Sequence, residues 1–390
     1  MIDYDPYSPE ALENPLPIYK QLRDEAPCYY LEKYDAWALS RFQDVWDCFR
    51  ENDRLSSEYG DIPNLVLQPK PREKPIVMIS HLDYAEHRKI METVGPAIGH
   101  DGVRRIAERM ETVCRAIVDN AAERGSFDMV HDVAWPAISH LTALICGLPE
   151  SEAETIHRIA HTGIDGIPDH AVGVYDESTE MLRGYIQRSR LQGFAGDGMI
   201  QVFGRLEEAG QLHERGDDVI AHHVINFLLG APAQFPKGFP HMAYRLYLNP
   251  DQRAEVAANP ELSRQAFLEA LRIDTSTQSM GRIVTQPIEF QGKTLEPGQA
   301  VLMLLASAER DEREYEHPDV FNIHRKPKRT LTFGVGEHYC AGRNFGPFLG
   351  ETLTRLLLER MPNYTIDDSN LKKFRTEFMK GWEELPTMAA

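Results

Sequence analysis

Cysteine is scarce in this chain, and its distribution does not suggest a disulfide framework. The five cysteines lie at irregular spacing, at positions 28, 48, 114, 146 and 340. Scattered free thiols are typical of proteins from a reducing compartment. The sequence opens without a basic segment followed by an apolar run, and it contains no uninterrupted run of about 18 apolar residues. We therefore expect a cytoplasmic protein with no signal peptide and no membrane contact.

Positive charge is also in short supply. Lys and Arg number 42 against 60 Asp and Glu, which gives a formal net charge of −18. Because phosphate binding depends on clustered Lys and Arg, a nucleic-acid partner is not expected. One basic run, residues 324–329, reads His-Arg-Lys-Pro-Lys-Arg. Two interpretations of this run are open: a solvated face, or a docking patch for an acidic partner.

Two further absences narrow the class of protein. No Gly-x-Gly-x-x-Gly motif follows an expected strand, and no Walker-type loop occurs, which argues against a Rossmann or phosphate-loop enzyme. No Gly/Ser linker, low-complexity tract or repeat divides the chain. The length alone suggests two or three domains, and the undivided composition is equally compatible with one large domain.

Helical and strand patterns occupy different parts of the sequence. Apolar residues recur at helical spacing through most of residues 83–275, with a break at 163–176. Strand-like patterns are confined to residues 26–40 and 282–306. The Pro-rich, polar interval 59–78 is typical of a long loop, and such loops often cover a site. The expected fold class is mainly α with a small antiparallel β subdomain.

Two local signals predict where elements begin and turn. Ser40 precedes a segment with Phe42, Val45 and Phe49 on one helical face, so we expect Ser40 to cap a helix. Gln291-Gly292 separates two strand-like runs and predicts a hairpin turn.

Glycines are concentrated around Cys340. Residues 329–346 contain glycines at positions 334, 336, 342 and 346. Glycine lets the backbone turn tightly and approach other groups closely. A thiol held by such a loop suggests a nucleophile or a soft-metal ligand. A small buried hydrophobe beside a turn is the alternative, and it is the commoner role of a lone cysteine.

The pattern Phe333-x-x-Gly336-x-His338-x-Cys340-x-Gly342 resembles the haem-binding loop of the cytochrome P-450 superfamily. Several fixed residue types around one cysteine make the match specific. The resemblance extends over nearly the whole chain.

Three charged residues outside the loop strengthen the resemblance. Glu269 and Arg272 match the Glu-x-x-Arg pair of the family, and this spacing puts both on one face of a helix. Arg325 matches the second arginine, which closes a structural Glu-Arg-Arg network. The resemblance implies a single cytochrome P-450 domain over residues 1–390, with its haem-thiolate loop at 331–346.

The resemblance implies haem b as the cofactor and the Cys340 thiolate as the axial ligand of iron. A thiolate ligand pushes electron density onto the iron and favours cleavage of the O–O bond. Phe333 is expected to cover the sulfur, and Gly342 to let backbone amides approach it. The residues expected to bind the haem propionates are His338, Arg282 and His87.

The substrate chamber is located only by the resemblance. The positions expected to line it are Phe227, Leu229, Gly230, Thr277, Phe378 and Met379. Most of these are apolar, whereas residues 275–279 read Thr-Ser-Thr-Gln-Ser. Two interpretations of this polar stretch are open: hydrogen bonds to a hydroxyl or carbonyl of the substrate, or a polar turn between a helix and a strand.

The oxygen side departs from the family pattern. Most members carry an acid followed by an alcohol in the central helix, where the pair orders water and delivers protons. Ala233 and Gln234 stand at these positions and are the candidate catalytic residues. Glutamine hydrogen-bonds water but cannot relay a proton by ionising. Pro232, Pro236 and Pro240 are expected to kink or break the helix.

The activity implied by the resemblance is that of a monooxygenase. It would insert one atom of O2 into a small, mostly apolar molecule, by hydroxylation or O-demethylation of an aromatic, terpenoid or steroid. Electrons would come from NAD(P)H through a ferredoxin reductase and a ferredoxin docking on the basic run 324–329. Because the acid–alcohol pair is replaced, a peroxide-dependent or redox-neutral haem-thiolate enzyme is the alternative. A haem-binding sensor is a third hypothesis, although no signalling domain is evident.

Clustered histidines suggest a competing metal site. His157 and His161 are four residues apart on an expected helix, with Glu154 one turn earlier. This spacing suits a metal ion, but no further ligand is evident. We interpret these histidines, and His222 and His223, as structural or surface residues.

Overall fold

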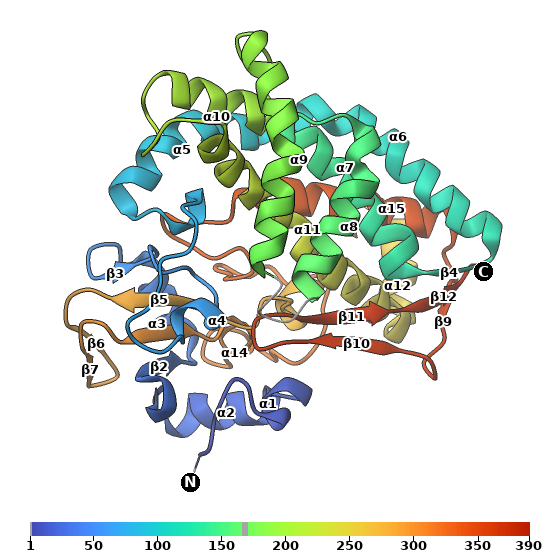
Figure 1. The fold of residues 1–390 in the computed structure, drawn as a ribbon. Coiled ribbons are helices and arrows are strands. Elements are labelled where there is room, and N and C mark those ends of the chain that lie inside the picture. Colours follow the sequence, from blue (N-terminus) through green and yellow to red (C-terminus); the bar gives the residue numbers. More distant parts are fainter. Residues whose placement is uncertain (1, 166–170) are drawn as a thin grey trace.

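Helices and strands gather in different parts of the molecule. The computed structural model describes residues 2–165 and 171–390, with the side chains at 162–165 and 171–172 left aside. The longer helices pack together on one side, and the main β-sheet lies on the other side beside the N-terminal helices (Figure 1). The expected fold class, mainly α with a small β part, is confirmed.

Helices occur along most of the chain, from α1 near its start to α15 near its end. A short helix, α4, lies inside the interval 59–78, which is otherwise loop. In chain order the helices are α1 (Pro9–Glu13), α2 (Leu16–Glu25), α3 (Phe42–Arg50), α4 (Pro63–Val66), α5 (Tyr84–Ile98), α6 (His100–Arg124), α7 (Trp135–Cys146), α8 (Ala153–Asp165), α9 (Ala171–Leu191), α10 (Met199–Glu208), α11 (Asp217–Leu248), α12 (Pro250–Ala258), α13 (Ser263–Ile273), α14 (Leu305–Ala308) and α15 (Phe345–Arg360).

The strands form one five-stranded sheet and several smaller ones. In chain order they are β1 (Cys28–Leu31), β2 (Ala36–Leu39), β3 (Leu55–Ser56), β4 (Ser126–Asp128), β5 (Met280–Val284), β6 (Ile288–Phe290), β7 (Lys293–Leu295), β8 (Ala300–Met303), β9 (Thr365–Ile366), β10 (Lys372–Arg375), β11 (Lys380–Glu384) and β12 (Pro386–Met388). The five-stranded sheet has the order β1-β2-β8-β5-β3. Its pairings are antiparallel as expected, except that β2 and β8 run parallel.

The hairpin predicted at Gln291-Gly292 is confirmed. β6 and β7 pair antiparallel across these two residues, whose φ angles are +52° and +71°. Two successive positive φ values give a turn whose twist matches the strands that it joins.

The predicted cap of α3 is wrong. The helix begins at Phe42, whose N–H donates to Asp311 Oδ2 at 2.9 Å, whereas the Ser40 hydroxyl donates to the carbonyl of Pro27 at 3.4 Å. Asp311 therefore satisfies a donor that the local sequence leaves without a partner. This contact ties the N-terminal part of the chain to the segment that leads into the cysteine loop.

The central helix α11 runs through three prolines. Pro232, Pro236 and Pro240 are all buried inside it, and it continues without interruption from Asp217 to Leu248. Of the two predicted outcomes, a kink or a break, the break is therefore wrong. An internal proline costs a helix about 3 kcal/mol, and packing of α11 against α7, α9 and α13 offsets this cost.

The predicted break at 163–176 falls partly outside the described residues. Residues 163–165 are the end of α8 and residues 171–176 are the start of α9, so the prediction is wrong for these parts of the interval, and residues 166–170 lie outside the described residues. The helices α6, α7, α11, α13 and α15 pack around one buried apolar cluster. None of the described helices has the length and apolarity needed to cross a membrane.

Candidate active site

The loop that carries Cys340 folds back on itself. The Cys340 N–H donates to the carbonyl of Phe333 at 3.0 Å. Gly334 and Gly336 have φ angles of +71° and +84°, a region that favours glycine. A Cβ at Gly336 would lie 2.6 Å from the backbone oxygen of Phe49, so the loop approaches the end of α3 too closely for any side chain.

The sulfur of Cys340 faces donors rather than carboxylates. Its Sγ accepts a hydrogen bond from the N–H of Gly342 at 3.3 Å. The side chain is exposed, yet the protein around it desolvates the sulfur and raises the pKa of the thiol, while the Gly342 amide and the Arg343 guanidinium lower it. The remaining cysteines are all buried. Cys340 is thus the accessible thiol, and amide donors at a sulfur suit a thiolate ligand.

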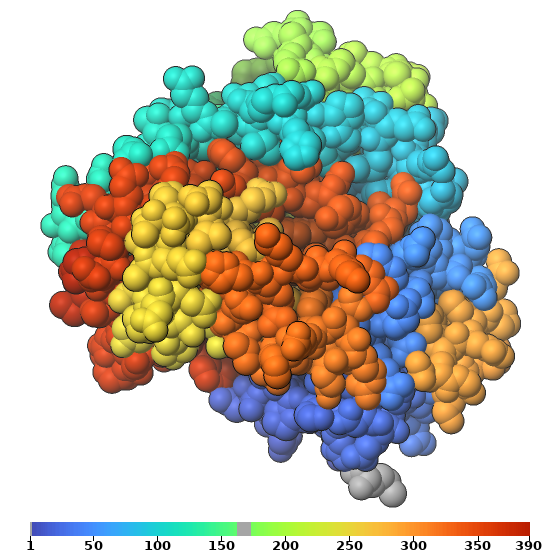
Figure 2. Space-filling view, turned by 180° about the vertical axis from the view of Figure 1, so that it is seen from behind, coloured from blue at the N-terminus to red at the C-terminus, as the bar shows by residue number. Residues whose placement is uncertain are grey.

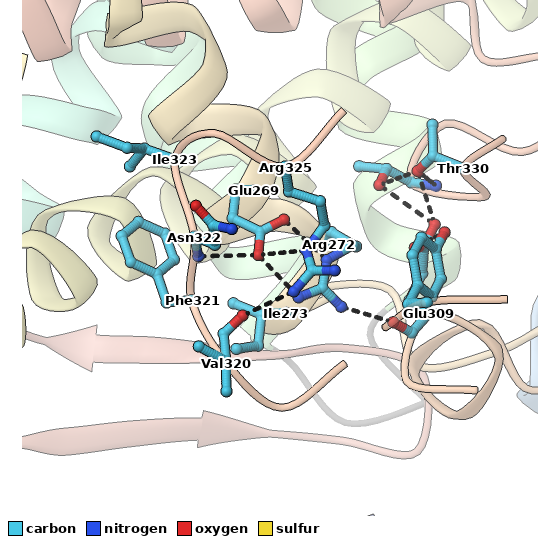
Figure 3. A network of polar contacts seen from close by, with 12 residues as sticks. Glu269, Arg272, Ile273, Glu309, Val320, Phe321, Asn322, Ile323, Arg325 and Thr330 are labelled. Carbon is cyan, nitrogen blue, oxygen red and sulfur yellow. Dashed lines mark hydrogen bonds and ion pairs between the residues drawn. The ribbon is translucent and has the colours of Figure 1, made fainter. Parts of the chain in front are cut away.

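A charge network is built around the buried carboxylate of Glu269 (Figure 3). Arg272 donates from Nε and Nη2 to the two carboxylate oxygens of Glu269, at 2.8 and 2.9 Å. Arg325 donates from Nε to Glu269 Oε1 at 3.0 Å, and its other nitrogens donate to the carbonyls of residues 316, 317 and 320. Burial alone would lower the pKa of Arg272, but the contact with Glu269 outweighs it and the pKa is raised. The structure thus brings together the three residues predicted to form the network.

Glu309 connects the network to the cysteine loop. Its backbone carbonyl accepts from Arg272 Nη1 at 2.8 Å. Its fully buried carboxylate accepts from the Thr330 hydroxyl at 2.8 Å, from the Leu331 N–H and from the Tyr315 hydroxyl at 2.6 Å. Burial raises the pKa of Glu309, and these donors oppose the rise. The role of Glu309 was not predicted, because its partners come from distant parts of the sequence.

Three basic side chains gather beside the loop. The ring centroids of His87 and His338 are 4.2 Å apart, and burial together with Arg282 and His87 lowers the pKa of His338 to about 2. Arg282 is 7% exposed and donates to the carbonyl of Gly281 at 2.7 Å. Burial lowers its pKa, and no carboxylate of the described residues forms an ion pair with it. A buried cation without an ion-pair partner is suited to an anionic ligand.

Two residues that the sequence did not suggest contact these histidines. His87 Nδ1 lies 3.2 Å from the carboxylate of Glu337, and His338 Nε2 lies 3.4 Å from the hydroxyl of Ser57. Burial lowers the pKa of His87, although Glu337 counteracts it. Ser57 adjoins β3 and precedes α4, so its place beside the loop follows from packing rather than from any local motif.

Gln234 is held by the polar stretch 275–279. Its Oε1 accepts from the Ser276 and Thr277 hydroxyls, each at 3.0 Å. Thr277 also pairs with Met379 in an isolated β-bridge. The structure therefore brings a predicted catalytic residue together with two predicted pocket residues.

The other predicted pocket residues divide into two groups. Ala233 packs with Met379 and Phe378 in a small apolar cluster next to Gln234. Gly230 is exposed, and a Cβ there would meet nothing within 4 Å. Phe227 and Leu229 pack instead in the helical core, with the Phe227 ring 6.1 Å from that of Phe203.

Comparison with known proteins bears directly on this arrangement. A family model described as Cytochrome P-450 matches residues 255–376. Cytochrome P-450 130 of Mycobacterium tuberculosis is 26% identical over 388 residues, covering 93% of this chain and 92% of that protein. The 20-oxo-5-O-mycaminosyltylactone 23-monooxygenase of Streptomyces fradiae is 27% identical over 379 residues, covering 94% of this chain and 88% of that protein. The chain belongs to the cytochrome P-450 superfamily.

The solved structures agree on the fold of this P-450. The structure of cytochrome P-450 CREJ in complex with (4-ethylphenyl) dihydrogen phosphate matches with a TM-score of 0.87 and 21% identity, covering 100% of both chains. Membership makes the protein an oxidoreductase that holds haem b through a cysteine thiolate. It acts on a small substrate with O2 and redox partners.

The residues present in this P-450 fit haem b. Cys340 offers an accessible sulfur with an amide donor already directed at it. Arg282 and His87 are buried, His338 lies half-buried against His87, and Arg282 has no ion-pair partner among the described carboxylates. Two anionic propionates would supply that partner.

The clustered histidines lie against aromatic rings. His157 and His161 surround Trp135, with ring centroids 4.7 and 5.6 Å from it. His223 stacks on Phe203 at 5.0 Å. Across the part of the chain that the structure describes, no group of three or more His, Cys, Asp or Glu side chains is placed to hold a metal ion.

The basic run 324–329 offers fewer free charges than its sequence suggests. Arg325 belongs to the buried network, and Arg329 donates to Glu314 while lying over the rings of Phe42 and Trp46. His324 lies 3.0 Å from Glu255. The exposed cations that remain in this run are Lys326 and Lys328. Figure 2 shows the face to which this segment, in orange, contributes.

Proposed function

We propose that Cys340 supplies the axial thiolate of a P-450 monooxygenase and that Arg282, His338 and His87 bind the haem propionates. The observation that carries this proposal is the Gly342 amide directed at the Cys340 sulfur from 3.3 Å, in the loop that also brings His338 against His87. When bound, the haem activates O2, and its thiolate ligand favours cleavage of the O–O bond.

The protein's own side chains would maintain this site. Phe333 would cover the sulfur and limit its contact with water, as the resemblance implies. The Gly342 amide stabilises negative charge on the sulfur, since hydrogen bonds to a ligating sulfur set its electronic properties. Glu269, Arg272 and Arg325 bind one another, and Arg272 also binds Glu309, whose carboxylate contacts the start of the loop. We also propose that residues 1–390 act as one catalytic domain.

Replacing the thiolate tests this assignment. Cys340→Ser is expected to lose the carbon monoxide difference band that is characteristic of a thiolate haem. Cys114→Ala, a change at a buried cysteine in the helical core, is the matched control and should keep the band. If Cys340→Ser kept the band, Cys340 would not be the ligand.

We propose a small, mostly apolar substrate, hydroxylated or O-demethylated, of aromatic, terpenoid or steroid type. Phe378 and Met379 are apolar and pack with Ala233 of α11, and a Cβ at Gly230, one turn before Gln234, would meet nothing within 4 Å. The bound (4-ethylphenyl) dihydrogen phosphate named for the CREJ structure supports an aromatic compound. Titration of spin-state shifts with methoxylated aromatics, terpenoids and steroids would identify the class.

Electrons are proposed to come from NAD(P)H through a ferredoxin reductase and a ferredoxin. The exposed Lys326 and Lys328 support docking of an acidic partner on this face. A cytoplasmic location remains a prediction from the sequence.

A peroxide-dependent or redox-neutral reaction is the alternative. It is favoured by one observation: Ala233 and Gln234, at the positions of the usual acid and alcohol, provide no ionisable group. Turnover with peroxide alone, without an electron donor, would support the alternative. Turnover that requires NAD(P)H and a ferredoxin would support the monooxygenase.

A further inference from the structure

The Gln234 carboxamide has a defined orientation. Its oxygen accepts from Ser276 Oγ and Thr277 Oγ1, both at 3.0 Å. An amide oxygen only accepts hydrogen bonds, so both hydroxyls donate to it. The carboxamide nitrogen must therefore point away from these two hydroxyls.

The two hydroxyls are themselves held by backbone pairing. The Lys380 N–H donates to the carbonyl of Ser276 at 2.8 Å, and the Gln278 N–H donates to the carbonyl of Phe378 at 2.7 Å. These bonds join the stretch 275–279 to the turn between β10 and β11. The backbone at Ser276 and Thr277 is thus fixed, and their hydroxyls hold the Gln234 side chain in one orientation.

The carboxamide nitrogen of Gln234 is available to a ligand. No described residue accepts a hydrogen bond from its Nε2, and this atom is not among the buried polar atoms without partners. Gly230 precedes Gln234 by one helical turn on the same face of α11 and borders open space. The nitrogen is therefore a donor beside a space that no side chain from position 230 fills.

We propose that Gln234 is a fixed hydrogen-bond donor to the substrate, and that Ser276 and Thr277 are positioning residues that set its direction. The substrate class that fits this donor carries an acceptor oxygen, as in an ether, ketone or ester. The proposal rests on the haem site proposed above, because it places the donor in the chamber of that site.

The hydroxyl protons of Ser276 and Thr277 are then both donated to the Gln234 oxygen. These residues do not donate to the substrate, and the donor that the substrate meets is the amide nitrogen. A ligand that merely adds a hydroxyl gains nothing as a donor here, whereas an ether oxygen gains one hydrogen bond. Selectivity for an acceptor over a methylene of the same size follows from this.

Two ligands of equal size test the proposal. 4-Methoxytoluene and 4-ethyltoluene differ only in an ether oxygen against a methylene. Their dissociation constants, measured by spin-state titration of the haem-loaded protein, should favour the methoxy compound by about threefold to tenfold, the range expected for one neutral hydrogen bond.

Variants separate the donor from its positioning residues. Gln234→Leu should abolish the preference, and Thr277→Val with Ser276→Ala should reduce it. Thr277→Ser, which keeps the hydroxyl, should retain it. Ser279→Ala is the matched control, since the Ser279 hydroxyl lies in the same stretch but donates to the carbonyl of Glu377 at 3.5 Å. A purely structural role of Thr277 would change affinity for both compounds equally.

Several results would overturn the proposal. These are equal constants for the two compounds in the unmodified protein, a preference that survives in Gln234→Leu, or no binding of 4-methoxytoluene at all. The carbon monoxide difference band, recorded on the same samples, distinguishes these failures from a failure of the haem assignment. If the unmodified protein did not show that band, the haem assignment itself would be refuted.

Discussion

The carboxylate of Glu309 lies 2.8 Å from the hydroxyl of Thr330, and this contact joins the buried charge network to the cysteine loop. The same oxygen accepts from the N–H of Leu331, where the loop begins. On the other side, the Glu309 carbonyl accepts from Arg272. Glu309 therefore connects the network to the residues at which the cysteine loop begins.

Glu309→Gln should destabilise the folded protein by about 2 kcal/mol, because the amide nitrogen cannot accept the hydrogen bonds that one carboxylate oxygen accepts. The free energy of unfolding in urea measures this loss. Glu316→Gln, at an exposed carboxylate, is the control and should change stability by less than about 0.5 kcal/mol. Equal effects of the two changes would show that Glu309 does not anchor the loop.

The two glycines before Cys340 should respond differently to alanine. Both have positive φ, but a Cβ at Gly336 would lie 2.6 Å from the Phe49 oxygen, whereas the nearest atom to a Cβ at Gly334 is 3.8 Å away. Gly336→Ala should therefore cost about 1 to 3 kcal/mol more than Gly334→Ala, since overpacking adds to the backbone strain. Urea unfolding of both variants gives the difference. Equal losses would mean that φ alone decides.

The cysteine loop and the charge network could be predicted because their sequence motifs are local. The spacing around Cys340 and the single turn between Glu269 and Arg272 are both visible in the sequence, and the structure brings the expected network together. Contacts between distant segments were not predicted. Asp311 caps a helix whose first residue is 269 positions away, and Ser57 reaches His338 across 281 positions. Only the packed core determines such pairs.

Local propensity also failed where packing outweighs it. The three prolines in α11 predict a kink or a break, yet the helix is not broken and all three are buried. The expectation that Phe227 and Leu229 line the chamber comes from their position alone; both contact the helical core, and their place in the chamber stays a prediction. A linear motif does not show which face of a buried helix borders a cavity.

His223 should make the protein acid-sensitive. Burial, with His213 and His222, lowers the pKa of His223 to about 3, and no partner of either ring nitrogen is found among the described residues. The ordinary pKa of histidine is about 6.5. Between this pH and the folded-state pKa of about 3, His223 binds a proton in the unfolded chain but not in the folded one. The stability contributed by neutral His223 is thus complete above about pH 6.5 and falls as the pH decreases.

The slope expected from this one group is about 1.4 kcal/mol per pH unit below pH 6.5. In His223→Leu the loss of stability between about pH 7 and about pH 5 should be smaller by about 2 kcal/mol. His100→Leu, at an exposed histidine, should leave the slope unchanged. Urea unfolding at both pH values checks this. Parallel slopes in the unmodified protein and His223→Leu would contradict it.

Lys326 and Lys328 should determine the rate with which a ferredoxin reduces the protein. Replacing both by Glu should lower the association rate about tenfold or more at low ionic strength, and salt should shrink the difference. The same change at Lys293, exposed on β7, is the control. Stopped-flow reduction at two salt concentrations measures it. A salt-independent effect would argue against electrostatic docking at this run.

Gln234→Ala should lower the fraction of electrons from NAD(P)H that appear in product. Gln234 stands where most members of the family have an alcohol that orders water, and its carboxamide is the polar group that replaces this alcohol on α11. Removing the carboxamide frees two hydroxyls and admits unordered water, so more electrons should end in peroxide. The ratio of product to NAD(P)H consumed gives the result, with Ser279→Ala as the control. An unchanged ratio of product to NAD(P)H would show that Gln234 does not order the water that delivers protons. That result would leave its role in binding the substrate untouched.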